Sequence, residues 1–101
     1  MSKKQELVAD TLIKRNEVKF LASALGEEIV MMNTDNGDYI GINSVGTDIW
    51  EVLIEPMRVD DLFNKILDLY IGSEADIRTD VDEFIKRALK LEMLVIPEPT
   101  N

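Results

Sequence analysis

Residues 35–53 read DNGDYIGINSVGTDIWEVL and contain a turn, a strand and a helix start in direct succession. The Asn-Gly pair favours a tight hairpin, because these residue types tolerate the positive φ angles that such turns need. In the strand that follows, Ile40 and Ile42 lie on one face. Tyr39 and Gly41 lie on the other face. The segment therefore predicts the second strand of a hairpin, leading directly into a helix.

Two further strands are predicted upstream of this hairpin. Residues 28–33 form a short run with high β-propensity, and Val18 and Phe20 alternate with polar or small residues. A turn around Gly26 would join these two strands. The region 13–43 is therefore predicted to form a three-stranded antiparallel meander.

The second half of the chain predicts three helices and a short strand. Apolar residues recur from Val59 to Tyr70 at i, i+3, i+4, i+7, i+8 and i+11, which is the spacing of an amphipathic helix. Trp50 falls on the apolar stripe of the preceding helix and is predicted to lie in the core. The four elements are a helix capped at Asn43 or Ser44 and ended by Pro56, a helix at 59–71, a helix at 76–91 and a strand at 92–96.

Strands followed by helices indicate an α+β domain. This order predicts a winged helix-turn-helix-like fold, in which a three-stranded antiparallel sheet packs on three helices. We expect one domain over residues 13–97, because a chain of 101 residues has the length of one domain. Residues 1–12 show no clear period and are expected to form an N-terminal arm or a short extra helix.

The charge of the chain limits its partners. There are 20 acidic and 11 basic residues, which gives a formal net charge of -9. Binding to nucleic acid or to an anionic membrane surface needs clustered Lys and Arg, so neither is expected as a partner. The charge is compatible with a positively charged partner, and equally with a role in solubility alone.

The residue types that usually carry catalysis are missing. The chain contains no His and no Cys, which removes the usual general base, the usual zinc ligands and thiol chemistry. The carboxylates concentrate where helices carry solvated charge, and no nucleotide-binding glycine motif occurs. We therefore expect no catalytic residue, no metal site, no cofactor and no enzymatic activity. The lack of Cys, of a signal peptide and of a membrane span is compatible with a cytoplasmic location.

An ordered set of residues within 37–53 resembles the PqqD-like family. The set is a Gly in the hairpin turn, an aromatic residue, an Ile followed by Asn43, a small residue at Gly46 and an Ile-Trp pair. The resemblance covers about residues 13–96. In the small residue and the Ile-Trp pair, the chain departs from the members named for quinone-cofactor biosynthesis. It is more similar to the stand-alone members found in lasso-peptide biosynthesis.

The resemblance implies a non-catalytic recognition element for the leader segment of a ribosomally made precursor peptide. The leader would add as a fourth, antiparallel strand beside residues 39–42 and lie in a groove against the third helix. Its usual companions would be a leader peptidase and an asparagine-synthetase-like cyclase, or else a radical-SAM enzyme. The expected peptide-binding residues are Tyr39, Ile40, Gly41 and Ile42 on the strand, Val81, Ile85 and Leu89 on the groove wall, and Asp82 and Lys86 at its rim.

The physics of edge strands agrees with this mode of binding. An edge strand exposes unpaired N–H and C=O groups, and an extended peptide satisfies them. Gly41 leaves room beside the backbone, although a glycine that simply fits a bend explains it equally well. The third helix has one apolar stripe, on which Ile77, Phe84 and Ala88 are expected to face the core.

A winged-helix transcription regulator that binds DNA is the alternative from another class. A recognition helix needs a positive outer face, and the predicted third helix carries four acidic residues in its first half. An enzyme is disfavoured by the lack of His and Cys. A purely structural subunit of a larger synthetase stays open.

Overall fold

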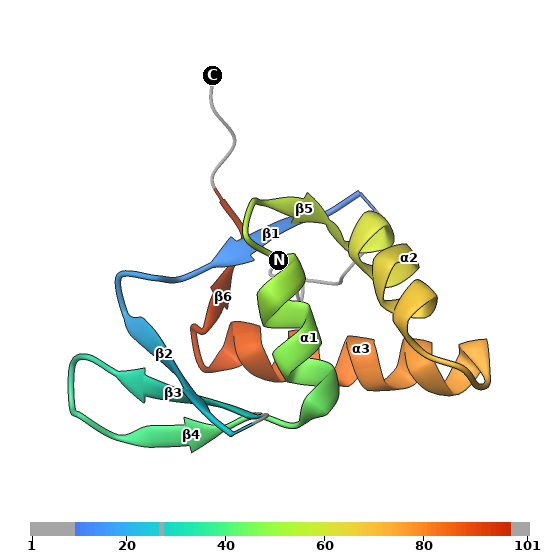
Figure 1. Cartoon of the computed structure of the whole chain (residues 1–101). Helices are drawn as coiled ribbons and strands as arrows, with labels where there is room; N and C mark the ends of the chain where they lie inside the picture. The colour runs from blue at the N-terminus through green and yellow to red at the C-terminus, as the bar shows by residue number, and fades with distance from the viewer. Residues whose placement is uncertain (1–9, 27, 98–101) are drawn as a thin grey trace.

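The structure is a computed structural model, and it describes residues 10–26 and 28–97. The predicted α+β class and the winged-helix-like arrangement are confirmed (Figure 1). The predicted N-terminal arm lies mostly outside the described residues. The elements in chain order are β1 (Leu12–Arg15), β2 (Phe20–Leu25), β3 (Glu28–Asn33), β4 (Tyr39–Gly41), α1 (Ser44–Val52), β5 (Met57–Arg58), α2 (Val59–Leu69), α3 (Glu74–Lys90) and β6 (Leu94–Val95).

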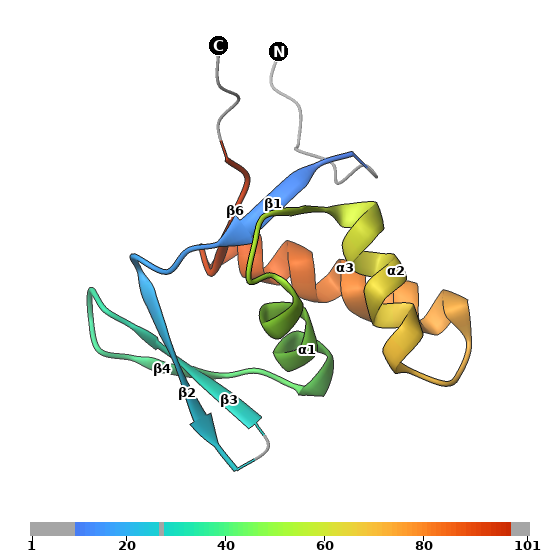
Figure 2. The same ribbon diagram turned by 45° about the horizontal axis from the view of Figure 1, so that its top comes forward.

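The predicted meander is formed by β2, β3 and β4, which pair antiparallel in that order. Its register places Met31 opposite Ile40. Gly37 adopts a φ of 77° at the turn between β3 and β4, where a side chain would strain the backbone. The Asn36 side chain accepts a hydrogen bond from the Asp38 amide (2.9 Å) in the same turn. Figure 2 shows the meander standing apart from α2, with α1 between them.

A second, smaller sheet is predicted only in part, because the strand expected at 92–96 is present as β6 but its pairing is not predicted. Its central strand β1 pairs antiparallel with both β5 and β6. The register places Ile13 opposite Met57 and Arg15 opposite Leu94. Because β5 has only two residues, no periodic pattern marks it. The pairing of the three strands depends on the helices that bring these segments together.

Side-chain caps determine where two of the helices begin. The Asn43 side chain accepts a hydrogen bond from the Gly46 amide (2.7 Å) at the start of α1. The Ser73 side chain accepts one from the Asp76 amide (3.3 Å). This second cap starts α3 at Glu74, two residues before the predicted start.

Two helices end earlier than predicted. α1 ends at Val52, well before Pro56, because Leu53 leaves the helical region of the backbone map. α2 ends at Leu69, because Tyr70 is extended. None of the helices in the described ranges combines the length and the apolar character needed to cross a bilayer.

Arg15 and Trp50 join α1 to the small sheet. Trp50 is 4% exposed, which confirms its predicted place in the core. The Arg15 guanidinium donates two hydrogen bonds to the Trp50 carbonyl (2.8 and 2.5 Å) and lies 4.9 Å from the centre of the indole ring. The last carbonyls of a helix have no intrahelical donor and attract cations, so this contact stabilises the end of α1.

Tyr70 and Asp48 join α2 to α1. The Tyr70 hydroxyl donates a hydrogen bond to the Asp48 carboxylate. Burial raises the pKa of Tyr70 from 10.0 to about 12, and the Asp48 carboxylate adds to this rise. The folded protein therefore favours the neutral phenol. Its contribution to stability is complete below pH 10.0 and is lost as the pH rises through about 12.

We expect Tyr70→Phe to lower the free energy of unfolding by about 1 kcal/mol at neutral pH, because one hydrogen bond is lost. The difference between parent and variant should shrink when the pH is raised above 10.0 towards 12, since the parent then loses the same contribution. Urea unfolding at both pH values measures it. Tyr39→Phe is the matched control, because Tyr39 is an exposed tyrosine. A difference that does not change with pH would contradict the expectation.

Candidate functional site

One long edge of β4 is open. In the part of the chain that the structure describes, β4 pairs with β3 and with no other strand. The Ile42 amide donates a hydrogen bond to the Ile29 carbonyl (3.4 Å), and the Asn33 amide donates one to the Asp38 carbonyl (2.8 Å). Main-chain bonds between antiparallel strands alternate from residue to residue. These two contacts therefore determine which residues of β4 face β3.

By this alternation, Asp38, Ile40 and Ile42 direct their main-chain groups at β3. Tyr39 and Gly41 direct their N–H and C=O groups at the open edge. Unpaired groups of this kind are a template for an added strand. The two residues could pair with an extended peptide without any change in the meander.

The side chains of β4 alternate as predicted. Met31, the cross-strand partner of Ile40, is fully buried, and Ile42 is 7% exposed, so this face packs on the helices. Tyr39 on the other face is 68% exposed. At Gly41, an added Cβ atom would meet nothing within 4 Å. The outer face of the strand is therefore open at these positions.

A hollow of about 180 Å³ lies where β4 leads into α1. It is lined by Asn43, Asp80, Glu83, Phe84 and Arg87. Asn43 follows the strand segment, and the other four residues come from α3. The structure therefore brings the end of the strand and one face of α3 together.

Gly46 determines how closely α1 approaches α3. A Cβ atom at this position would lie 2.4 Å from Cε1 of Phe84, much closer than side chains pack. The Phe84 ring therefore lies directly on the backbone of α1. It is 9% exposed, and it contributes to the wall of the hollow. Any side chain at Gly46 would have to displace this ring.

On the helix side of the predicted site, Val81 and Ile85 are 1% and 0% exposed and therefore lie in the core. Their contact with a bound peptide stays a prediction. Asp82 and Lys86 each lie two residues from Phe84, which is roughly 200° around a helix of 3.6 residues per turn. They therefore point away from the Phe84 ring, and neither of them lines the hollow.

None of the five residues that line the hollow belongs to the predicted site, and three of them are charged, namely Asp80, Glu83 and Arg87. Spacings of four and three residues place Asp80, Phe84 and Arg87 on one face of α3, and this signal is present in the sequence. Phe84 is in the core, as predicted, and also lines the hollow. Leu89, predicted on the groove wall, packs partly buried against the core.

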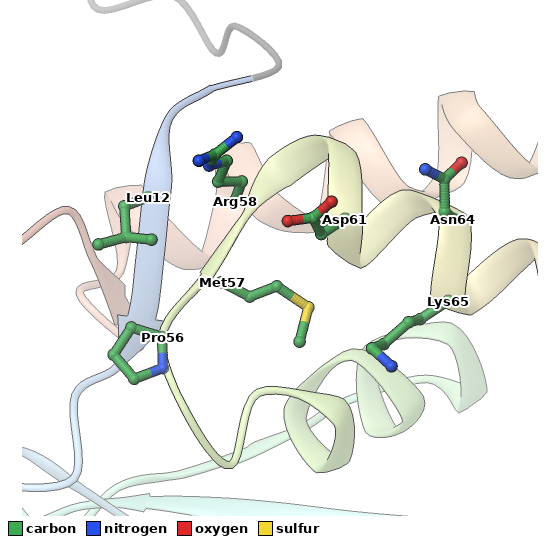
Figure 3. A pocket seen from close by; sticks show the side chains of 7 residues that line it. All are labelled: Leu12, Pro56, Met57, Arg58, Asp61, Asn64 and Lys65. Atoms are coloured by element: carbon green, nitrogen blue, oxygen red, sulfur yellow. The ribbon is translucent and has the colours of Figure 1, made fainter.

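A second hollow of about 530 Å³ lies beside β1, β5 and α2 (Figure 3). It is lined by Leu12, Pro56, Met57, Arg58, Asp61, Asn64 and Lys65. Although it is larger, the strand at its wall has two residues and offers few main-chain groups to a peptide. Over the ranges that the structure describes, no group of three His, Cys, Asp or Glu residues could hold a metal ion. The open edge of β4 is therefore the candidate site.

Fold and site together define a small winged-helix-like domain with a free sheet edge beside its third helix. The chain belongs to the PqqD family, because the pattern of this family, described as coenzyme PQQ synthesis protein D, matches residues 28–94. The solved structure of TbiB1 in complex with the TbiA(beta) leader peptide is similar to this chain, with a TM-score of 0.68 and 23% identity over 80% of this chain and 93% of that one. Comparison with curated proteins finds no match.

Proposed function

We propose that this protein binds the leader segment of a ribosomally made precursor peptide as an added strand and delivers it to processing enzymes. The observation that carries the proposal is the outward-facing main chain of Tyr39 and Gly41, next to a hollow on α3. A peptide running antiparallel along residues 39–42 would bond to these groups and place alternate side chains against α3. The side chains of Ile40 and Ile42 would hold β4 in place by packing against the core.

Membership of the PqqD family supports the proposal, and so does the likeness to TbiB1, whose structure contains a leader peptide. The partners proposed here are a leader peptidase and an asparagine-synthetase-like cyclase of lasso-peptide biosynthesis, or else a radical-SAM enzyme. The protein itself would act without catalysis, in the cytoplasm. The lack of His and Cys supports this non-catalytic role.

The arrangement of α3 disfavours the alternative of a DNA-binding winged helix. The Arg78 guanidinium lies 3.9 Å from the centre of the Phe63 ring, so this cation packs within the domain. Glu74 and Asp76 occupy the first turn of α3, where recognition helices contact base edges. A gel shift with random duplex DNA at low salt checks this point. We expect no shift.

Gly41→Pro tests the proposed strand addition. The Gly41 N–H faces the open edge, so proline removes a donor for the peptide and leaves the pairing with β3 intact. We expect binding of a peptide selected from a random display library to weaken at least about tenfold, or 1.4 kcal/mol. Fluorescence anisotropy measures the affinity, and circular dichroism checks the fold.

Gly41→Ala is the control for this variant. It keeps the N–H group, and the added Cβ enters open space, so the affinity should stay within about a factor of two of the parent. A folded Gly41→Pro variant that binds the same peptide as tightly as Gly41→Ala would show that the peptide lies elsewhere.

A further inference from the structure

We propose that the hollow at the end of β4 is a side-chain pocket of the peptide site and takes one Lys or Arg side chain of the bound peptide. This inference rests on the proposed function, because it assigns a ligand chemistry to the same groove. It starts from the five residues that line the hollow, which are Asn43, Asp80, Glu83, Phe84 and Arg87.

The wall of the hollow suits a long cationic side chain. Phe84 provides an apolar surface, and the backbone of α1 at Gly46 holds its ring in place. The aliphatic stem of Lys or Arg packs on such a surface. Asp80 and Glu83 place two carboxylates at the same hollow. An acidic side chain would meet two like charges and one opposite charge there, and a short apolar one would gain nothing from the carboxylates.

The charged groups at the hollow are available to a ligand. The ion pairs found over residues 10–26 and 28–97 are Arg15–Glu17, Lys19–Glu92 and Arg58–Asp10. None of these pairs involves Asp80, Glu83 or Arg87. A bound cation therefore breaks no ion pair among the described residues.

Arg87 limits the pocket to one cation. It lies one helical turn beyond Glu83 and lines the same hollow. Its guanidinium repels a second positive side chain beside the first. The net charge of -9 attracts every basic peptide from a distance, whatever its sequence. A test must therefore separate the local contact from this general attraction.

The test compares the parent with two double variants that each remove two acidic charges. Asp80→Asn/Glu83→Gln removes them from the hollow. Asp60→Asn/Asp68→Asn removes them from exposed positions of α2, outside the hollow. A random library of displayed dodecapeptides is selected on the parent. The most enriched peptide is then synthesised with Lys and with Gln at its enriched basic position, and both forms are titrated by fluorescence anisotropy.

We expect the parent to enrich peptides with a single Lys or Arg at a fixed position. It should bind the Lys form about fivefold more tightly than the Gln form, the size of effect expected for partly exposed ion pairs. This ratio of the two affinities should fall to about one in Asp80→Asn/Glu83→Gln, because that variant lacks both carboxylates of the hollow. It should stay near the parent's value in Asp60→Asn/Asp68→Asn.

Three other results would overturn the inference. If the control double variant also loses the preference for the Lys form, the net charge of the protein explains this preference, and the hollow does not. If the parent enriches peptides without a fixed basic position, the inference about the pocket fails, but strand addition can still hold. Shifts of the Tyr39 and Gly41 amide NMR signals on peptide binding would then demonstrate strand addition. If no peptide is enriched, both the inference and the proposed function fail.

Discussion

Ile85→Asp is expected to unfold the protein. Ile85 is fully buried on α3, next to the buried side chains of Val81 and Ala88. Removing the Ile side chain costs about 2–5 kcal/mol, and an unpaired carboxylate in the core costs several more. Native domains are stable by about 5–15 kcal/mol in total. The substitution therefore removes most or all of the stability of this domain.

Circular dichroism and a thermal melt measure this loss. Lys86→Asp is the matched control, because it places the same side chain at the next, exposed position of α3. This control should change the free energy of unfolding by no more than about 1 kcal/mol. If Ile85→Asp instead melts cooperatively near the temperature of the parent, Ile85 is accessible. It would then be open to a peptide in the groove, as the sequence predicts.

Trp50→Ala should lower the free energy of unfolding by about 3–5 kcal/mol, the range for large aromatic side chains truncated in cores. The indole is almost fully buried, so the substitution leaves a cavity in the core beside α1. It also removes the ring on which the Arg15 guanidinium stacks. The two hydrogen bonds from Arg15 to the carbonyl of residue 50 can persist, because they involve the main chain.

Urea unfolding monitored by circular dichroism gives the size of this effect. Tyr39→Ala is the control, since it truncates an aromatic side chain that is exposed on β4. Its effect should stay within about 0.5–1 kcal/mol. Equal unfolding midpoints for the parent and Trp50→Ala would contradict the placement of Trp50 in the core.

Burial separates the residues of α3 that test folding from those that test binding. Substitutions at Val81 or Ile85 test stability, because both side chains are buried. Substitutions at Asp80, Glu83 or Arg87 test the hollow. Asp80, Glu83 and Arg87 are exposed, so changing them should leave the fold intact.

The sequence alone predicts the meander and the three helices, because the signals for these elements are local. An Asn-Gly turn needs positive φ at Gly37, and the structure has it there. Asn43 satisfies an amide at the start of α1 whatever lies around it. The regular apolar spacing from Val59 to Tyr70 identifies α2 without any knowledge of its neighbours. The strand side of the candidate site, residues 39–42, follows from the same local signals together with the family pattern.

The tertiary structure alone determined the small sheet and the face of α3 that meets β4. Strands of two residues carry no period, so their pairing with β1 arises when the helices pack. The apolar stripe of α3 shows which residues avoid water, but not which neighbour each one meets. That choice depends on how α1 crosses α3, and the crossing is set by the absence of a side chain at Gly46 against the Phe84 ring. The contact between Gly46 and Phe84 joins residues 38 positions apart and leaves no periodic signal in the sequence. Only the tertiary structure therefore shows that Asp80 and Arg87 line the hollow while Val81 and Ile85 lie in the core.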